Sequence, residues 1–268
     1  MPGNGIGYDN LYLFTRYDIT DIYNADSSTG IISNFNFGGA RVELPSGQGL
    51  NLFPLWTSYT DPWIGYMIND NANDIAKGLE PRHSVEAVES ADRVQVAQNR
   101  EIIRQIEALV GETDEAILAG GDLNTVSASD WSVENADIPS HHGQSFDFEA
   151  TDLWERAGYR DVYRTANPDV AAAAGSTWSP HEPQNLVPQR IDFTFARGEG
   201  IDVLSAWNVD TRLPQHGDGL FYSDHAAVVA DLRIGSQPAP VPLPAGGLLL
   251  ASALAMGLAT RRLGARRA

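Results

Sequence analysis

Alternating apolar positions mark two strands early in the chain. Apolar side chains recur at about every second position over residues 40–44 and again over 50–55, on either side of a Gly/Ser turn. Successive side chains of a strand point to opposite faces, so this spacing predicts two half-buried β-strands. The apolar positions are Ala40, Val42, Leu44, Leu50, Leu52 and Leu55.

A helical pattern follows over residues 85–112. Val94, Ile102, Ile106 and Leu109 fall near one stripe of a helix, and Gly111 stands where a helix would end. The spacing therefore predicts one long amphipathic helix.

The remaining pattern is β-like. An apolar strand over residues 115–124 follows the helix, and four further short segments suggest strands. Strand, helix and strand in this order predict a layered α/β protein. No repeat and no second domain is visible before residue 235. The four later segments are residues 159–164, 190–198, 201–209 and 225–234.

The C-terminal residues have a different composition. Residues 235–245 form a Pro/Gly linker, residues 246–260 carry no charge, and residues 261–268 contain four arginines. A buried terminal helix is one interpretation. The basic tail after an apolar run favours another, a transmembrane segment at 246–260 with residues 261–268 in the cytoplasm. The apolar run reaches the usual lower limit of about 17 residues only when counted from Leu243.

Charge and cysteine content narrow the function. Lys and Arg number 18 against 35 Asp and Glu, which gives a net charge of −17. An acidic protein repels polyanions, so nucleic acid is a possible partner that is not favoured. The chain has no cysteine, which excludes disulfides and thiolate metal sites. The first residues show no signal-peptide pattern.

Three short motifs carry candidate chemistry. Asp122 and Asn124 lie two apart at the end of a strand, Asp192 lies between apolar residues, and Asp224 and His225 precede the last strand. A simple strand and turn would also explain the first pair. An anionic ligand beside a neutral amide, however, suits a divalent cation together with a phosphate oxygen. A buried Asp192 needs a partner.

The motifs GDLN, RIDF and SDHAAV, in this order, resemble those of the endonuclease/exonuclease/phosphatase superfamily, the fold of deoxyribonuclease I. The segments GSTWSP and AGYRDVYR also match its bacterial branch, so the resemblance covers about residues 10–234. It implies a four-layer α/β sandwich of two packed mixed sheets flanked by helices. It also implies a Mg²⁺- or Mn²⁺-dependent hydrolase acting on a phosphate ester.

The resemblance assigns roles to individual residues. Asp122 would position the attacking water and help bind the metal, and Asn124 would hold a phosphate oxygen. Asp224 would bind metal, and His225 would act as the general base with its tautomer fixed by Asp192. Two further candidates for substrate binding are Arg16, within the family's first motif, and Trp178, a packing residue at the edge of the cleft.

Two family features are missing. No strand with an Asn and no strand with a metal-binding Glu precedes residue 10, which we interpret as a lost N-terminal segment. Trp56 stands where the family has a His, and Pro54 where it has an Asn. Tryptophan cannot accept a proton through a ring nitrogen, so the alternative is a catalytically impaired member that binds a cell-surface or matrix partner. His141 and His142 fit a polar loop better than a metal site.

The C-terminus carries a second resemblance. The segment VPLPAGGLLL, an apolar run and an Arg tail, at residues 241–268, resemble the VPLPA variant of the PEP-CTERM sorting signal of Gram-negative bacteria. This implies export to the cell envelope or beyond, transient membrane anchoring, and processing by an exosortase. The absence of a signal peptide conflicts with export. A lost N-terminal segment would explain both this absence and the absence of the family's first two strands.

Overall fold

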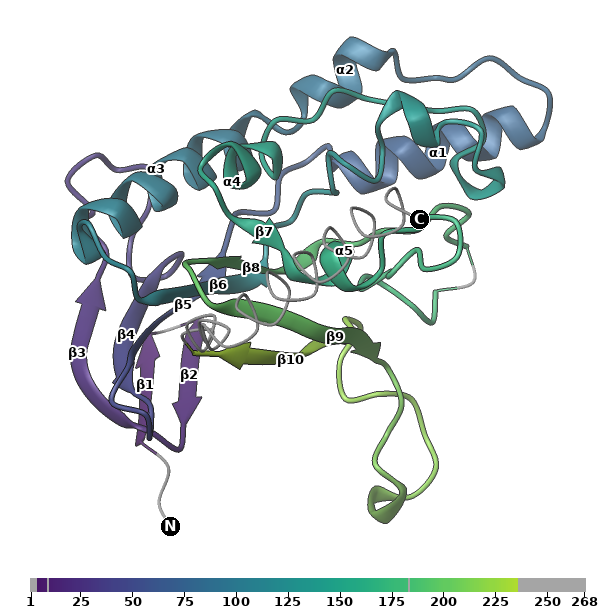
Figure 1. The fold of residues 1–268 in the computed structure, drawn as a ribbon. Helices are drawn as coiled ribbons and strands as arrows, with labels where there is room; N and C mark the ends of the chain where they lie inside the picture. The colour runs from purple at the N-terminus through teal and green to yellow at the C-terminus, as the bar shows by residue number, and fades with distance from the viewer. Residues whose placement is uncertain (1–3, 9, 183, 236–268) are drawn as a thin grey trace, which may run out of the picture. The chain divides into compact units, whose positions relative to one another are not determined.

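A six-stranded mixed sheet carries the site (Figure 1). The structure is a computed structural model that describes residues 4–8, 10–182 and 184–235. Neighbouring strands in the sheet are antiparallel except β5 and β6, which are parallel. The order is β3 (Asp18–Asn24), β4 (Gly38–Glu43), β5 (Gly49–Trp56), β6 (Ala116–Asp122), β8 (Asp192–Arg197) and β7 (Arg160–Asp161).

The strand pair predicted over residues 40–55 is confirmed. Strands β4 and β5 form a hairpin in which Ala40 pairs with Leu52 and Val42 with Leu50. Ala40, Val42 and Leu50 are buried. The alternating pattern therefore identified both strands and most of the buried positions, although Leu44 and Leu52 are only half-buried.

Helices cover one face of the sheet (Figure 1). Ile102 and Ile106 of the long helix α3 pack in one core cluster with Phe53, Ile117 and Phe195 of the sheet. These side chains are at most 2% exposed, which is the apolar burial that stabilises the layer. The helices on this side are α1 (Ile64–Ala76), α2 (Val85–Ser90), α3 (Arg93–Val110) and α4 (Asp152–Arg156).

The prediction of one continuous helix over residues 85–112 is wrong, because this segment forms two helices, α2 and α3. The chain breaks between α2 and α3 at Ala91 and Asp92, where the Asp92 carboxylate turns inward to accept hydrogen bonds from Thr125 Oγ1 (2.5 Å) and the Ala150 N–H (3.1 Å). The end of the helix is as predicted, because Gly111 caps α3 with φ 62°. Helix α1 had no counterpart in the prediction.

Two antiparallel hairpins lie on the other face of the sheet: β1 (Asn4–Tyr8) with β2 (Leu11–Thr15), and β9 (Ile201–Val209) with β10 (Ala227–Ile234). Among the described residues the two hairpins do not pair with each other. A groove of about 440 Å³ lies between them. Leu13, Leu118, Gly120 and Val228 line it, and Asp192 lies at its wall.

The prediction of a strand over residues 159–164 is largely wrong. Only Arg160–Asp161 is a strand, and helix α5 (Val162–Ala166) follows at once. Asp161 explains the change, because its carboxylate accepts a hydrogen bond from the Arg164 N–H (3.0 Å) and so caps the new helix. The described residues also form three short 3₁₀ helices: η1 (Val133–Asn135), η2 (Pro139–His141) and η3 (Pro214–His216).

The predicted α/β sandwich is confirmed in its class and in its packed sheets.

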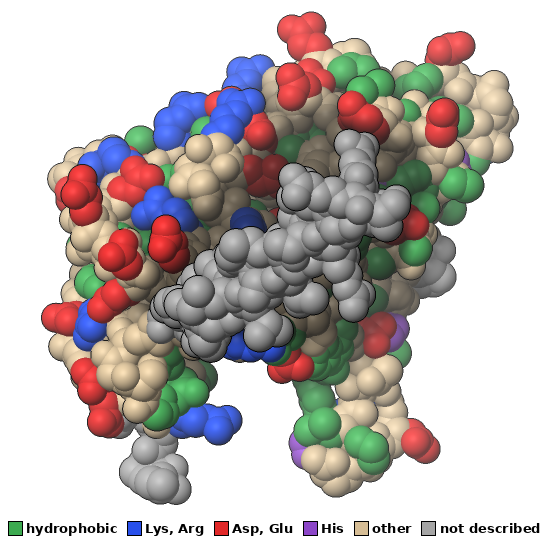
Figure 2. Space-filling view, viewed as in Figure 1, with side chains coloured by type: hydrophobic (Ala, Val, Ile, Leu, Met, Phe, Trp, Pro, Cys, Tyr) green, Lys and Arg blue, Asp and Glu red, His purple; other side chains and the backbone are tan. Residues whose placement is uncertain are grey.

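Acidic side chains are spread over the visible face, and Lys and Arg gather on the side of α3 and α4 (Figure 2). No helix in the described part of the chain is long and apolar enough to cross a membrane. The predicted segments at 246–260 and 261–268, and all of the predicted linker at 235–245 except Gly235, lie outside the described residues.

Candidate active site

Two carboxylates face each other at one end of the central sheet. Strands β6 and β8 are antiparallel, and Asp122 pairs directly with Asp192 in their register. The two glycines before Asp122 allow the neighbouring strands to approach closely. A β-carbon on Gly121 would lie 1.9 Å from Leu55 O, and one on Gly120 would lie 2.6 Å from Phe193 O. The glycine pair therefore fixes the position of the carboxylate that follows it.

Asn124 holds the Asp122 carboxylate in place. Its backbone is left-handed, with φ 47°, and its backbone N–H donates to Asp122 Oδ1 (2.8 Å). Its side-chain Nδ2 donates to Asp122 Oδ2 (2.9 Å) and to Thr57 O (2.8 Å). Both amide hydrogens thus have partners within the protein. The predicted contact of Asn124 with a phosphate oxygen stays a prediction, and the contacts present make it a positioning residue.

His225 is oriented by Asp192. Its Nδ1 lies 2.8 Å from Asp192 Oδ2, with side chains 27% and 18% exposed. The Asp192 N–H in turn donates to Thr177 Oγ1 (3.1 Å), which is fully buried. A carboxylate at Nδ1 favours a proton on that nitrogen and leaves Nε2 free to accept one. The pair therefore has the geometry of an oriented general base.

The site carries uncompensated negative charge. Burial and the nearby charge of Asp192 raise the pKa of Asp122 to about 7, although hydrogen bonds from Asn124 and Trp56 and the charge of His225 act against the shift. Burial lowers the pKa of His225, but the hydrogen bond to Asp192 and the charges of Asp192, Asp122 and Asp224 raise it overall. No Lys or Arg is among these influences.

The donor set fits a divalent cation. Asp122, Asp192 and His225 each offer one ligand atom, and these atoms lie within 4.8 Å of one another. Carboxylate oxygens are the ligands that Mg²⁺ and Mn²⁺ prefer, and a cation would relieve the repulsion between the two carboxylates. Asp224 is exposed and does not belong to this group, so its role as a metal ligand stays a prediction.

A sequence model described as the Endonuclease/Exonuclease/phosphatase family matches residues 5–225. The chain belongs to this family. The family's name covers nucleases and phosphatases, which hydrolyse phosphate esters. No curated protein is similar enough in sequence to be matched to the chain.

Solved structures show the same fold at low identity. The catalytic domain of human Nocturnin matches with a TM-score of 0.50 and 12% identity, over 84% of this chain and 63% of that one. A humanized D. rerio TDP2 matches with a TM-score of 0.50 and 16% identity, over 86% and 76%. An endonuclease/exonuclease/phosphatase from Beutenbergia cavernae matches with a TM-score of 0.47 and 17% identity, over 85% and 48%. The chain thus spans about half the length of the Beutenbergia protein.

Trp56 lies at the candidate site but is not one of the possible metal ligands. It ends β5 and pairs with Asp122 in the parallel register, and its side chain acts to lower the pKa of Asp122. Its ring also meets Phe35 edge to face, with the ring centroids 5.2 Å apart. An indole nitrogen only donates, so Trp56 can hold Asp122 but cannot accept a proton.

Other predicted residues are not among the possible metal ligands of the cluster. Arg16 is exposed between β2 and β3 and makes no hydrogen bond or ion pair with a described residue. Trp178 forms a backbone bridge with His225 and packs edge to face on Trp63. The polar-loop interpretation is wrong for His141, which is fully buried and stacks on Trp131 with the ring centroids 4.2 Å apart.

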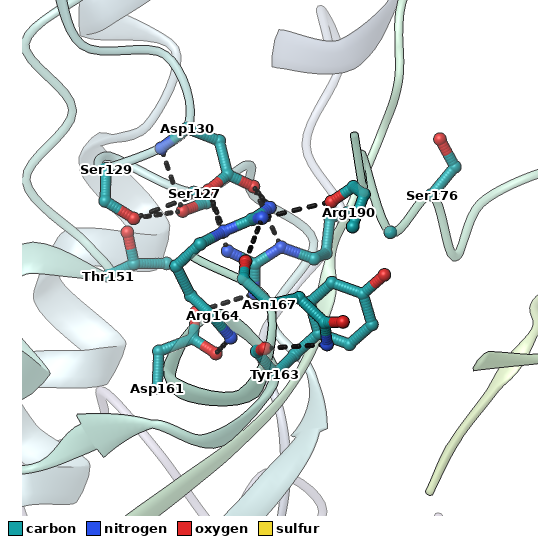
Figure 3. A network of polar contacts seen from close by, with 12 residues as sticks. Ser127, Ser129, Asp130, Thr151, Asp161, Tyr163, Arg164, Asn167, Ser176 and Arg190 are labelled. Atoms are coloured by element: carbon teal, nitrogen blue, oxygen red, sulfur yellow. Dashed lines mark hydrogen bonds and ion pairs between the residues drawn. The ribbon is translucent and has the colours of Figure 1, made fainter. Parts of the chain in front are cut away.

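A network of buried charged side chains lies next to the site, and the sequence patterns did not predict it (Figure 3). Asp130 accepts two hydrogen bonds each from Arg164 and Arg190, at 2.9 to 3.1 Å. Arg190 also donates to Asp161 (2.6 Å). A sequence signal existed: Arg190 stands beside apolar residues at the start of a strand, where an arginine requires a buried carboxylate.

Proposed function

We propose that this protein is a divalent-metal-dependent phosphoesterase that uses water as the nucleophile. The observation that carries the proposal is the Asp122, Asp192 and His225 cluster, in which Asp192 orients the imidazole. Mg²⁺ or Mn²⁺, held by Asp122 and Asp192, would supply charge neutralisation at the phosphate. The family's chemistry supports the same reaction class.

The side chains would move one proton in two steps. His225 Nε2 takes a proton from the attacking water as the new bond forms between the water oxygen and phosphorus. The bond between phosphorus and the alcohol oxygen breaks, and His225 returns the proton to that oxygen. Asp192 stabilises the imidazolium in between, and Asp122 orients the water. General acid–base catalysis of this kind contributes about 10²- to 10⁴-fold in rate.

The second candidate is a catalytically impaired member that binds a surface or matrix partner. Trp56 favours it, because an N–H donor stands where the sequence comparison expects a histidine. An indole can donate a hydrogen bond to a phosphate oxygen, but it cannot take up a proton from water. The two candidates differ in turnover, which makes them separable.

Hydrolysis of a generic phosphodiester and phosphomonoester tests the proposal. The assay compares the protein in Mg²⁺, in chelator, and with Asp192→Asn or His225→Ala. Chelator-sensitive turnover that both variants lose supports the enzyme. Absence of turnover in every condition, with the protein folded, contradicts it and favours the binding protein.

We also propose that the protein is exported and anchored through residues 246–260, with exosortase processing near 241–245. The Pro-rich segment, the apolar run and the Arg tail support this. Fractionation of the native host, with mass spectrometry of the mature C-terminus, tests it. A cytoplasmic protein with an intact tail would be the contradicting result.

A further proposal concerns the two strands that the family resemblance leads us to expect before residue 10. Asp192 lies at the wall of the groove between β2 and β10, so a carboxylate on a strand bound in this groove would lie near the site. Expression from an earlier start in the native gene tests this. Greater Mg²⁺-dependent activity in the longer product is the expected result, and equal activity would contradict it.

A further inference from the structure

Four aromatic rings form a continuous cluster beside the catalytic residues. We call Tyr59, Trp63, Tyr66 and Trp178 the aromatic ledge. Trp63 is its buried centre, 2% exposed, and its ring centroid lies 4.8 Å from that of Trp178, 5.1 Å from Tyr66 and 6.4 Å from Tyr59. Tyr66 and Trp178 both stand nearly perpendicular to Trp63, at 85° and 82°. These are favourable edge-to-face contacts, which hold the rings in place.

Two contacts attach the ledge to the site. The indole Nε1 of Trp63 donates to Asn124 O (2.8 Å), and Asn124 holds Asp122. Trp178 forms its backbone bridge with His225. The ledge is therefore connected to Asp122 through Asn124 and to His225 through Trp178.

The outer rings of the ledge offer unused surface. Tyr59 is 50% exposed and Tyr66 is 47% exposed. No hydrogen bond to a described residue is recorded for the Tyr59 hydroxyl, the Tyr66 hydroxyl or the Trp178 indole nitrogen. Packing accounts for buried Trp63, but it does not account for the exposed faces and free donors beside it.

The charge around the ledge limits what could bind. The cation–π contacts of the described residues involve other rings, at Tyr159, Tyr163, Phe193 and Tyr222. A long nucleic-acid strand requires cations along its phosphates, and the chain has a net charge of −17. A small ester with one phosphate at the catalytic cluster and an uncharged group on the ledge fits better.

We propose that the aromatic ledge stacks a flat aromatic ring in the alcohol portion of the phosphate-ester substrate. This inference rests on the proposed function and names the substrate class of the same site. The faces of Tyr59 and Tyr66 receive the ring, and the free donors of the ledge bind acceptor atoms on its edge. Stacking on exposed aromatic side chains tolerates many ring types, so the ledge selects a class of compound.

Binding of three monoesters of primary alcohols tests the proposal. Adenosine 5′-monophosphate carries a flat ring, ribose 5-phosphate only a sugar ring, and glycerol 1-phosphate no ring. Calorimetry on the full chain with Mg²⁺ should give about tenfold tighter binding for the nucleotide than for the other two. Tyr59→Ala and Tyr66→Ala should each remove most of that preference, while Tyr66→Phe, which keeps the ring and loses only the hydroxyl, should retain most of it.

A matched control uses Trp207, which is 42% exposed on β9 and is not part of the ledge. Trp207→Ala should leave the preference unchanged. Equal binding of ribose 5-phosphate and the nucleotide, or a preference that survives both Tyr→Ala changes, overturns the proposal.

Hydrolysis of the same three compounds separates this inference from the proposed function. Selective nucleotide binding without turnover supports the ledge and rejects the phosphoesterase. Turnover of all three at equal kcat/KM, unchanged in Tyr66→Ala, supports the phosphoesterase and rejects the ledge.

Discussion

Two groups of charged side chains lie next to each other in this protein and behave in opposite ways. In the buried network, Asp130 and Asp161 are paired with Arg164 and Arg190, and Arg190 is only 2% exposed (Figure 3). In the catalytic cluster, Asp122 and Asp192 face each other and His225 is the only described positive partner. Arg190 and Asp192 are two residues apart in sequence.

The difference shows in the pKa values of the two aspartates. Burial disfavours the charge of Asp130, but Arg190 and Arg164 outweigh it and hold the pKa of that carboxyl below its usual range. Burial and Asp192 instead raise the pKa of Asp122 to about 7. A compensated charge stabilises the fold, whereas an uncompensated one is available for a cation or a substrate.

The largest expected effect is on the compensated side. Arg190→Met should lower the free energy of unfolding by about 3–5 kcal/mol, because it leaves Asp161 buried without its arginine. Urea denaturation measures this. Arg233→Met, which breaks an exposed pair with Asp202, should change stability by less than about 1 kcal/mol. Similar losses of stability in the two variants would mean that the buried ion pairs of Arg190 matter no more than an exposed pair.

A change in the catalytic cluster should instead reduce activity and leave stability intact. Asp192→Asn should reduce kcat/KM at least about 100-fold, because His225 loses its orienting carboxylate. Stability should stay the same or rise slightly, because the repulsion with Asp122 is removed. Parallel assays of turnover and urea denaturation check both halves. A strongly destabilised Asp192→Asn protein would place this residue with the buried network instead.

Asp92 lies between the two cases, because hydrogen bonds alone compensate its charge. Burial raises its pKa to about 6, against the hydrogen bonds from Thr125 and Ala150. A carboxyl whose pKa is raised in the folded state contributes stability that is full below its ordinary pKa of 3.8. That contribution is lost as the pH rises through about 6, by at most about 3 kcal/mol.

Asp92→Asn should therefore gain stability relative to the unchanged protein between pH 4 and pH 7, in steps followed by urea denaturation. Asp147→Asn, at an exposed position, is the control and should show no such trend. A constant difference at all pH values would mean that the carboxylate of Asp92 is fully compensated.

The smallest expected effect is a metal-dependent shift in stability. Mg²⁺ at ten times its dissociation constant should stabilise the fold by about 1.4 kcal/mol, and chelation should reverse this. Asp122→Asn should abolish the shift, whereas Arg164→Lys in the buried network should preserve it. Thermal denaturation measures it without any reference to turnover.

The amino-acid sequence determined the class of the fold and singled out the residues of the candidate site. Period-two alternation identified β4 and β5, and the ordered motifs singled out Asp122, Asp192 and His225, which the structure brings together. These features depend on neighbours in the chain or on short motifs, so local patterns record them.

Tertiary structure alone decided the rest, because it depends on contacts between distant segments. The break at Asp92 follows from hydrogen bonds to Thr125 and Ala150. The start of α5 is an exception, because the Asp161 cap is a local contact with Arg164, three residues away. The partners of Arg190, the hydrogen bond from the Asn124 amide to Thr57 O and the contact of Trp63 with Trp178 likewise involve residues far apart in sequence. Packing brought these groups together, and no local pattern could show which of them would meet.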